Sequence, residues 1–135
     1  AARNEHIKNK IKPALLKKKI VICDRFIDST LAYQVYGKKV DIKFIQNIHK
    51  KILDGVKPNI VFILKVDEKI SRARLQKRKT KNRYDNFSKS FYSKAQKSFL
   101  KIAKNKKNYY VLNSSSNDNK LEKKIFNIVN KHLNI

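Results

Sequence analysis

Polar side chains crowd into positions 24–34 of the chain. Asp24 and Arg25 stand side by side directly after an apolar run. The guanidinium of Arg25 offers a planar fork that fits phosphate oxygens, and the carboxylate of Asp24 can hold a hydrated Mg²⁺ or orient the arginine. Side chains able to hydrogen-bond a base and a sugar follow at Ser29, Thr30, Tyr33 and Gln34. On Asp24 and Arg25 alone, however, we favour a structural salt bridge at a strand end before a capped helix.

A strand and a helix must position this pair. Residues 20–23 are continuously apolar and β-branched apart from Cys23, a pattern typical of a buried parallel strand. Before them, apolar residues at helical spacing predict a helix over residues 1–17, with Pro13 as a potential kink. We therefore expect Asp24 and Arg25 at the C-terminal end of a buried strand.

The rest of the chain alternates helices with two further apolar runs. These runs predict strands at residues 60–66 and 109–112. Helices are expected between Asp41 and Gly55, from Asp67 to about residue 79, over residues 88–103, and after a capping box at Asn119 to Glu122. This alternation predicts a parallel α/β sheet, whose ligands bind beyond the C-terminal ends of the strands.

The chain carries a formal net charge of +24. That charge raises the alternative of a basic nucleic-acid-binding protein. The basic residues are 28 Lys and only 6 Arg, and they are spread along the chain, so we interpret them mainly as a solvated surface. No apolar run approaches the about 18 residues of a membrane span, and we expect a cytoplasmic protein.

Other reactive residue types have structural interpretations. The single cysteine, Cys23, excludes an internal disulfide and a cysteine-based zinc site, and we expect it in the core. The three histidines have no metal-ligand spacing and are expected at the surface: His6, His49 and His132. Phenylalanines at helical spacing are expected in the core at positions 87, 91, 99 and 126.

The segment from Ile22 to Gln34 resembles the thymidylate kinase motif. That motif has an aliphatic strand end, Asp-Arg-aromatic, two free positions, Ser-Ser/Thr, one free position and Ala-Tyr-Gln, and every defined position is filled. Residues 1–3, 12–15 and 57–67 also resemble family segments. The resemblance implies a P-loop NTPase-like three-layer αβα sandwich with a parallel sheet, in one domain over 1–135 with a lid at about 76–86.

The resemblance implies an enzyme that transfers the γ-phosphoryl group of ATP to dTMP, with Mg²⁺, in dTTP biosynthesis. Its dTMP-binding residues would be Arg3, Arg25, Ser29, Thr30, Tyr33 and Gln34. Ser29 and Thr30 would read the thymine edge, and Tyr33 would pack against the deoxyribose. Asp24, holding the metal through water, would act in catalysis with Arg25, Arg78 and Arg83. ATP would contact Arg74, Arg78, Ser114 and Ser115. The family is usually homodimeric, without membrane or specific nucleic-acid partners.

Two observations depart from the family pattern. The phosphate-binding loop G-x-x-x-x-G-K-[ST] does not occur, since the only glycines are Gly37 and Gly55. The chain also lacks methionine and opens in a helical pattern, so we expect Ala1 to be a truncation point and the first strand to be missing. We therefore expect the 135-residue chain alone to be inactive and aggregation-prone. A related deoxynucleoside or other nucleotide kinase of the same fold remains the alternative enzyme.

Overall fold

The computed structural model describes residues 2–78, 88–116 and 118–134. These residues form two compact units, Ala1–Pro58 and Asn59–Ile135. The first unit is helical, and the second contains a sheet with helices.

The first unit opens with one continuous helical segment, as predicted for residues 1–17. It consists of α1 (Ala2–His6), a π-helical stretch η1 (Ile7–Ile11) and α2 (Lys12–Leu16). The backbone N–H of Lys12 donates to the carbonyl of Ile7, five residues back, directly before Pro13. A π-turn at this point is the local accommodation of a proline that cannot donate a backbone hydrogen bond. Ile7 and Ile11 point into the unit and are buried.

The motif segment forms a second bent helix in the same unit. It runs through α3 (Ile27–Thr30) and the π-helical η2 (Leu31–Gly37). The next helix, α4 (Ile42–Leu53), packs against η2 and α1. Asp41 caps α4 by accepting a hydrogen bond from the Phe44 N–H at 2.7 Å, as its sequence position predicted. Gly55, predicted as the helix stop, follows with a φ of 79°, a conformation that favours glycine.

The predicted strand at residues 20–23 is wrong for this structure. The segment has no strand assignment, and the side chains of Ile20 and Ile22 are 67% and 94% exposed. Cys23, expected in the core, is also exposed. A strand requires a neighbouring strand for its backbone hydrogen bonds, and the described part of the first unit contains only helices and connections.

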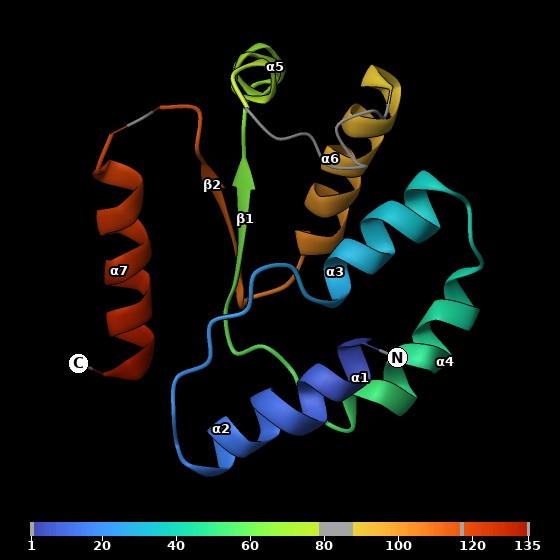
Figure 1. The fold of residues 1–135 in the computed structure, drawn as a ribbon. Helices are drawn as coiled ribbons and strands as arrows, with labels where there is room; N and C mark the ends of the chain where they lie inside the picture. The colour runs from blue at the N-terminus through green and yellow to red at the C-terminus, as the bar shows by residue number, and fades with distance from the viewer. Residues whose placement is uncertain (1, 79–87, 117, 135) are drawn as a thin grey trace. The chain divides into compact units, whose positions relative to one another are not determined.

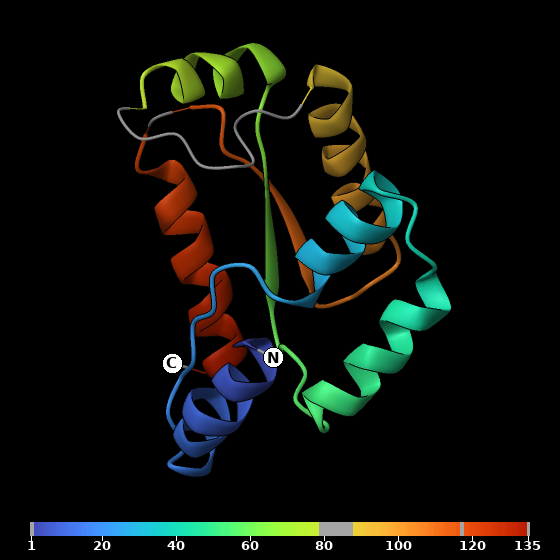
Figure 2. The same cartoon turned by 45° about the vertical axis from the view of Figure 1, so that its right-hand side comes forward.

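The second unit is built on two parallel strands, β1 (Val61–Lys65) and β2 (Tyr109–Asn113). They lie side by side with Ile63 opposite Val111, and both fall where the sequence predicted strands (Figure 1). The helix α6 (Lys89–Ala103) packs against both strands, and α7 (Lys120–Leu133) lies on the other side of the sheet (Figures 1 and 2). This helix–sheet–helix order is the layering expected of an αβα sandwich.

The helix caps of the second unit follow the sequence with one exception. Asp67 caps α5 (Glu68–Gln76) through the Lys69 N–H at 2.8 Å, and Ser88 accepts from the Phe91 N–H at the start of α6. Asn119 makes no capping bond, so the predicted capping box is wrong. Asp118 accepts from the Lys120 N–H instead, at 3.2 Å.

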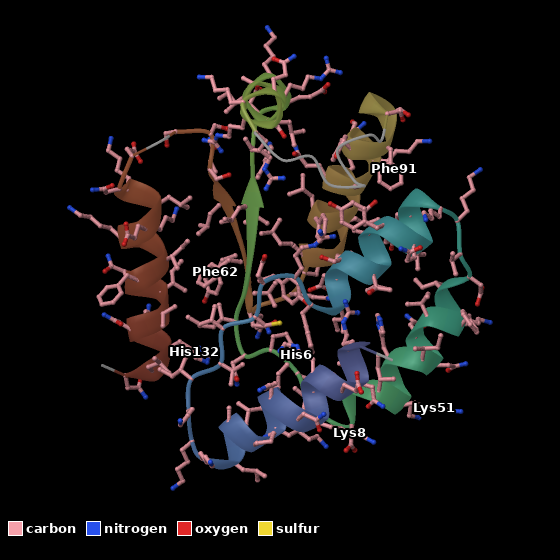
Figure 3. The ribbon with its side chains drawn as sticks, in the orientation of Figure 1. His6, Lys8, Lys51, Phe62, Phe91 and His132 are labelled. Carbon is pink, nitrogen blue, oxygen red and sulfur yellow. The ribbon has the colours of Figure 1, made fainter. Side chains whose placement is uncertain are left out.

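The surface is largely charged, as the spread of lysines predicted. Lys8 and Lys51 extend outward from the first unit, and His6 and His132 are exposed as expected (Figure 3). Phe126 was predicted in the core but is 63% exposed, because it lies off the α7 face that carries Ile125 and Ile128. Among the described residues, no helix has the length and apolar character needed to cross a bilayer.

Candidate functional site

A hydrogen bond joins the beginning of the chain to the motif segment. Nη1 of Arg3, on α1, donates to Oγ1 of Thr30, on α3, at 2.6 Å. The Arg3 guanidinium also lies 6.0 Å from the centre of the Phe26 ring. Its side chain is partly removed from water, and this burial lowers the pKa of Arg3. Cys23 acts in the opposite direction, and the nearby Arg25 cation lowers the pKa further. An arginine remains charged under such a shift, so the site holds a partly desolvated cation.

The backbone conformation of Arg25 places its side chain beside α3. Its φ of 61° places it in the left-handed region, which non-glycine residues rarely adopt. This turn directs the guanidinium back along α3, where Nε lies 3.4 Å from Oγ of Ser29. The guanidinium also stacks over the Tyr33 ring, 5.0 Å from its centre. Strained backbone at a polar cluster is typical of functional sites.

The α3 turn itself is anchored in the interior. Asp28, Ser29 and Ala32 are 7%, 9% and 0% exposed. Because Thr30 and Tyr33 come from the same short helical stretch, burial of these residues fixes where both side chains stand. The structure therefore brings five predicted site residues together in the first unit: Arg3, Arg25, Ser29, Thr30 and Tyr33.

His49 belongs to this neighbourhood, although the sequence predicted it at the surface. It is only 7% exposed, on the inner face of α4 one turn after the buried Ile45. Burial lowers the pKa of His49, the Arg3 cation lowers it further, and Asp28 acts in the opposite direction. The surface prediction was wrong because His49 falls at i, i+4 from Ile45, a spacing that places both on one helix face.

Two further predicted site residues flank this cluster in the sequence. Asp24 is exposed at the bend before α3. Gln34 is half-buried in η2, where its backbone carbonyl accepts from the Val40 N–H at 3.0 Å. Among the described residues there is no group of three acidic, histidine or cysteine side chains that could enclose a metal ion.

A second polar cluster lies in the second unit, beyond the C-terminal ends of β1 and β2. Arg74 on α5 donates from Nη1 to the Ser114 carbonyl at 2.9 Å and from Nη2 to the Ser115 carbonyl at 3.2 Å. Oγ of Ser115 accepts from the Asp67 N–H at 3.0 Å, and Oγ of Ser114 donates to the Lys65 carbonyl at 3.2 Å. Arg74 thus anchors the loop that follows β2 to α5, and the two serines hydrogen-bond the same loop to the end of β1.

The predicted lid is represented only in part. Arg78 is exposed just after α5, while Arg83 and the segment 79–87 lie outside the described residues. The lid at 76–86 and the single domain over 1–135 therefore stay predictions.

The chain resembles known proteins along most of its length. A family model described as thymidylate kinase matches residues 1–125. The chain belongs to the thymidylate kinase family. It is 48% identical over 101 residues to the thymidylate kinase of Wolbachia pipientis wMel, covering 75% of this chain and 50% of that protein. It is 41% identical over 132 residues to the thymidylate kinase of the Wolbachia strain wPip, covering 96% and 62%.

A solved structure agrees with these relatives. The crystal structure of thymidylate kinase from Ehrlichia chaffeensis superimposes with a TM-score of 0.71 at 33% identity. It covers 94% of this chain and 60% of that one, so the chain spans about half to three-fifths of the thymidylate kinases it matches. The fold is therefore α/β and P-loop NTPase-like, as the motif resemblance implied.

For the first unit, the sequence predicted candidate site residues but not the contacts between them. The bonds from Arg3 to Thr30 and from Arg25 to Ser29 were not foreseen, and neither was the place of His49. The spacing of His49 from Ile45 was the signal available for its burial.

Proposed function

We propose that this protein is a dTMP kinase, which transfers the γ-phosphoryl group of ATP to dTMP and yields dTDP for dTTP synthesis. The observation that carries the proposal is the cluster of Arg3, Arg25, Ser29, Thr30 and Tyr33 in the first unit. This cluster contains two guanidinium groups, two hydroxyls and a phenol. Guanidinium groups bind phosphate, and the hydroxyls and the phenol can contact a base and a sugar, so the set is suited to a phosphorylated nucleoside. Membership of the thymidylate kinase family supports dTMP as that nucleotide.

On the dTMP side of the site, different residues bind the phosphate, the base and the sugar. Arg25, raised over Tyr33, binds the phosphate of dTMP, because an exposed planar fork can grip two phosphate oxygens. Ser29 and Thr30 hydrogen-bond the thymine edge, with Gln34 as a further contact to the base. Tyr33 packs on the deoxyribose and crowds a 2′-hydroxyl. Arg3 reaches the nucleotide with the N–H groups that Thr30 does not occupy.

Asp24 fits a role toward Mg²⁺. It is an exposed carboxylate next to Arg25, and Mg²⁺ in kinases is held by one or two carboxylates, waters and substrate phosphates rather than by a protein cage. The lack of a three-ligand cluster in the described residues is compatible with this mode of binding. When bound, the ion neutralises charge on the phosphates. Asp24 would hold it through water.

On the ATP side, the loop clasped by Arg74 receives the adenine. Ser114 and Ser115 present that loop at the C-terminal ends of parallel strands, where α/β sheets bind ligands. In the transfer itself, an oxygen of the dTMP phosphate attacks the γ-phosphorus and the bond to the β–γ bridging oxygen breaks, releasing ADP. We assign Arg78 and Arg83 to the equatorial oxygens, whose charge a guanidinium stabilises.

A coupled assay of the protein expressed from its complete gene tests this function. ADP formation is measured with ATP and Mg²⁺ against dTMP, dUMP, thymidine and AMP. We expect dTMP to be the preferred acceptor. Turnover of thymidine but not of dTMP would identify a deoxynucleoside kinase and overturn the proposal.

We further propose that the active protein is a homodimer, as the family resemblance implies. Light scattering of the purified protein at micromolar concentration measures this directly. A mass equal to one chain at concentrations where the enzyme is active would contradict the dimer and leave the activity proposal intact.

A further inference from the structure

A buried histidine in the first unit, His49, has a ring nitrogen that makes no hydrogen bond to any described residue. His49 lies on α4, which packs against α1 and η2, and only 7% of it is exposed. Among the described residues, its Nε2 is the buried side-chain nitrogen or oxygen that makes no hydrogen bond. Buried polar atoms are nearly always paired, so an unpaired one has a cost that requires an explanation.

The charges that act on His49 come from two other helices. Arg3 on α1 and Asp28 on α3 both influence its ring, and Arg3 is the residue that bonds Thr30. A neutral imidazole offers one nitrogen as an acceptor, and a guanidinium carries five N–H donors in a fixed plane. Arg3 stands on α1, which packs against the α4 helix that carries His49, so its guanidinium is a donor from a neighbouring helix.

We propose that His49 is a positioning residue for Arg3, accepting an Arg3 N–H at Nε2 when the guanidinium turns from Thr30 toward bound dTMP. This inference rests on the proposed function, because dTMP is the ligand that draws Arg3 from Thr30. In the structure Arg3 donates to Thr30, and Nε2 of His49 makes no hydrogen bond within the described part of the chain. In the complex, Nε2 fixes the guanidinium plane and frees the Thr30 hydroxyl for the base.

Two measurements distinguish a positioning role of His49 from a space-filling role: the change in stability without ligand and the change in dTMP binding when His49 is replaced. If His49 only fills space, an apolar residue of similar volume changes stability and dTMP binding in the same direction. If Nε2 is held open for Arg3, the same change removes an unpaired buried atom from the free protein and a hydrogen bond from the complex. Stability without ligand then stays or rises while dTMP binding falls.

The experiment compares His49→Leu and His49→Asn in the protein from the complete gene. Thermal unfolding without ligand and the dTMP dissociation constant by calorimetry are measured for each. We expect His49→Leu to leave the unfolding midpoint unchanged or higher and to weaken dTMP binding about tenfold. His49→Asn, whose amide oxygen can accept an N–H, recovers most of that loss and remains informative if the leucine variant does not fold.

An Arg3→Lys background provides the coupling control. There we expect His49→Leu to have little further effect on dTMP binding, since lysine lacks the guanidinium plane. The proposal would be overturned if the losses of dTMP affinity caused by Arg3→Lys and His49→Leu were additive in the double variant. A fall in the unligated unfolding midpoint of His49→Leu would also overturn it. Unchanged dTMP binding in His49→Leu overturns the role of His49 and leaves the kinase proposal standing, whereas wild-type protein that does not bind dTMP overturns both.

Discussion

The guanidinium of Arg25 lies 5.0 Å from the centre of the Tyr33 ring. Arg25 reaches this position from a left-handed backbone conformation at the start of α3, and Tyr33 lies two turns later in η2. An aromatic face attracts a cation and restricts its motion. The stack therefore holds the Arg25 guanidinium at a fixed position.

Removing the Tyr33 ring is expected to weaken dTMP binding. Tyr33→Leu should raise the dTMP dissociation constant about threefold to fivefold, because an exposed cation–π contact contributes about 0.5–1 kcal/mol. Tyr33→Phe keeps the ring face and should stay within about twofold. Calorimetric titration with dTMP measures both, and equal losses in the two variants would show that the hydroxyl, not the stack, matters.

The left-handed conformation of Arg25 predicts a difference between two small replacements. Both Arg25→Gly and Arg25→Ala lose the guanidinium, but only alanine keeps a Cβ at a φ of 61°. We expect the glycine variant to unfold with a free energy roughly 0.5–1 kcal/mol higher than the alanine variant, net of the greater chain entropy of glycine. Urea denaturation measures this; an alanine variant as stable as the glycine variant would argue against backbone strain.

Acid should destabilise the first unit through His49. Burial holds the pKa of His49 below its ordinary value of 6.5, so the unfolded chain binds a proton at a higher pH than the folded chain. Stability is therefore full above pH 6.5 and falls as the pH drops from 6.5 toward the folded pKa. His49→Asn removes a titrating group and should flatten this part of the profile. Urea midpoints measured between pH 7.5 and about 5 test it, and an equal slope in both proteins would contradict it.

We expect replacement of Arg74 to raise the KM for ATP, and replacement of Arg72 on the same helix to leave it nearly unchanged. Arg74→Ala removes both hydrogen bonds to the Ser114 and Ser115 carbonyls. We expect the KM for ATP to rise about threefold to tenfold through loosening of that loop. Arg72→Ala is the matched control: Arg72 pairs with Glu68 at 3.6 Å on the exposed face of α5, a contact worth little. A similar KM change in both variants would indicate a general charge effect.

The exposed apolar run at residues 20–23 predicts self-association of the 135-residue chain. Ile22 is 94% exposed in a β-branched segment that lacks a strand neighbour within the described part of its unit, and such segments pair between molecules. Ile22→Lys should reduce light scattering on heating. Phe126→Lys, at an exposed helical position, should reduce it less. A cooperative and reversible thermal transition of the unmodified chain would contradict this prediction.

Much of this protein could be predicted from the local sequence. The apolar runs near residues 60 and 110 became β1 and β2, and Asp41 and Asp67 cap the helices that they were expected to cap. These features depend on residues within a few positions of each other, which a sequence displays directly. The motif from Asp24 to Gln34 also identified the family by its residue types and spacing.

The tertiary structure decided what depends on distant neighbours. Residues 20–23 have strand-like composition, yet a strand forms only where another strand offers hydrogen bonds, and the described first unit has none. Arg3 meets Thr30 across 27 positions, and His49 is buried on α4, which packs against α1 and η2. A sequence fixes which side chains are present and which local turns they favour, but packing between helices determines which of them meet.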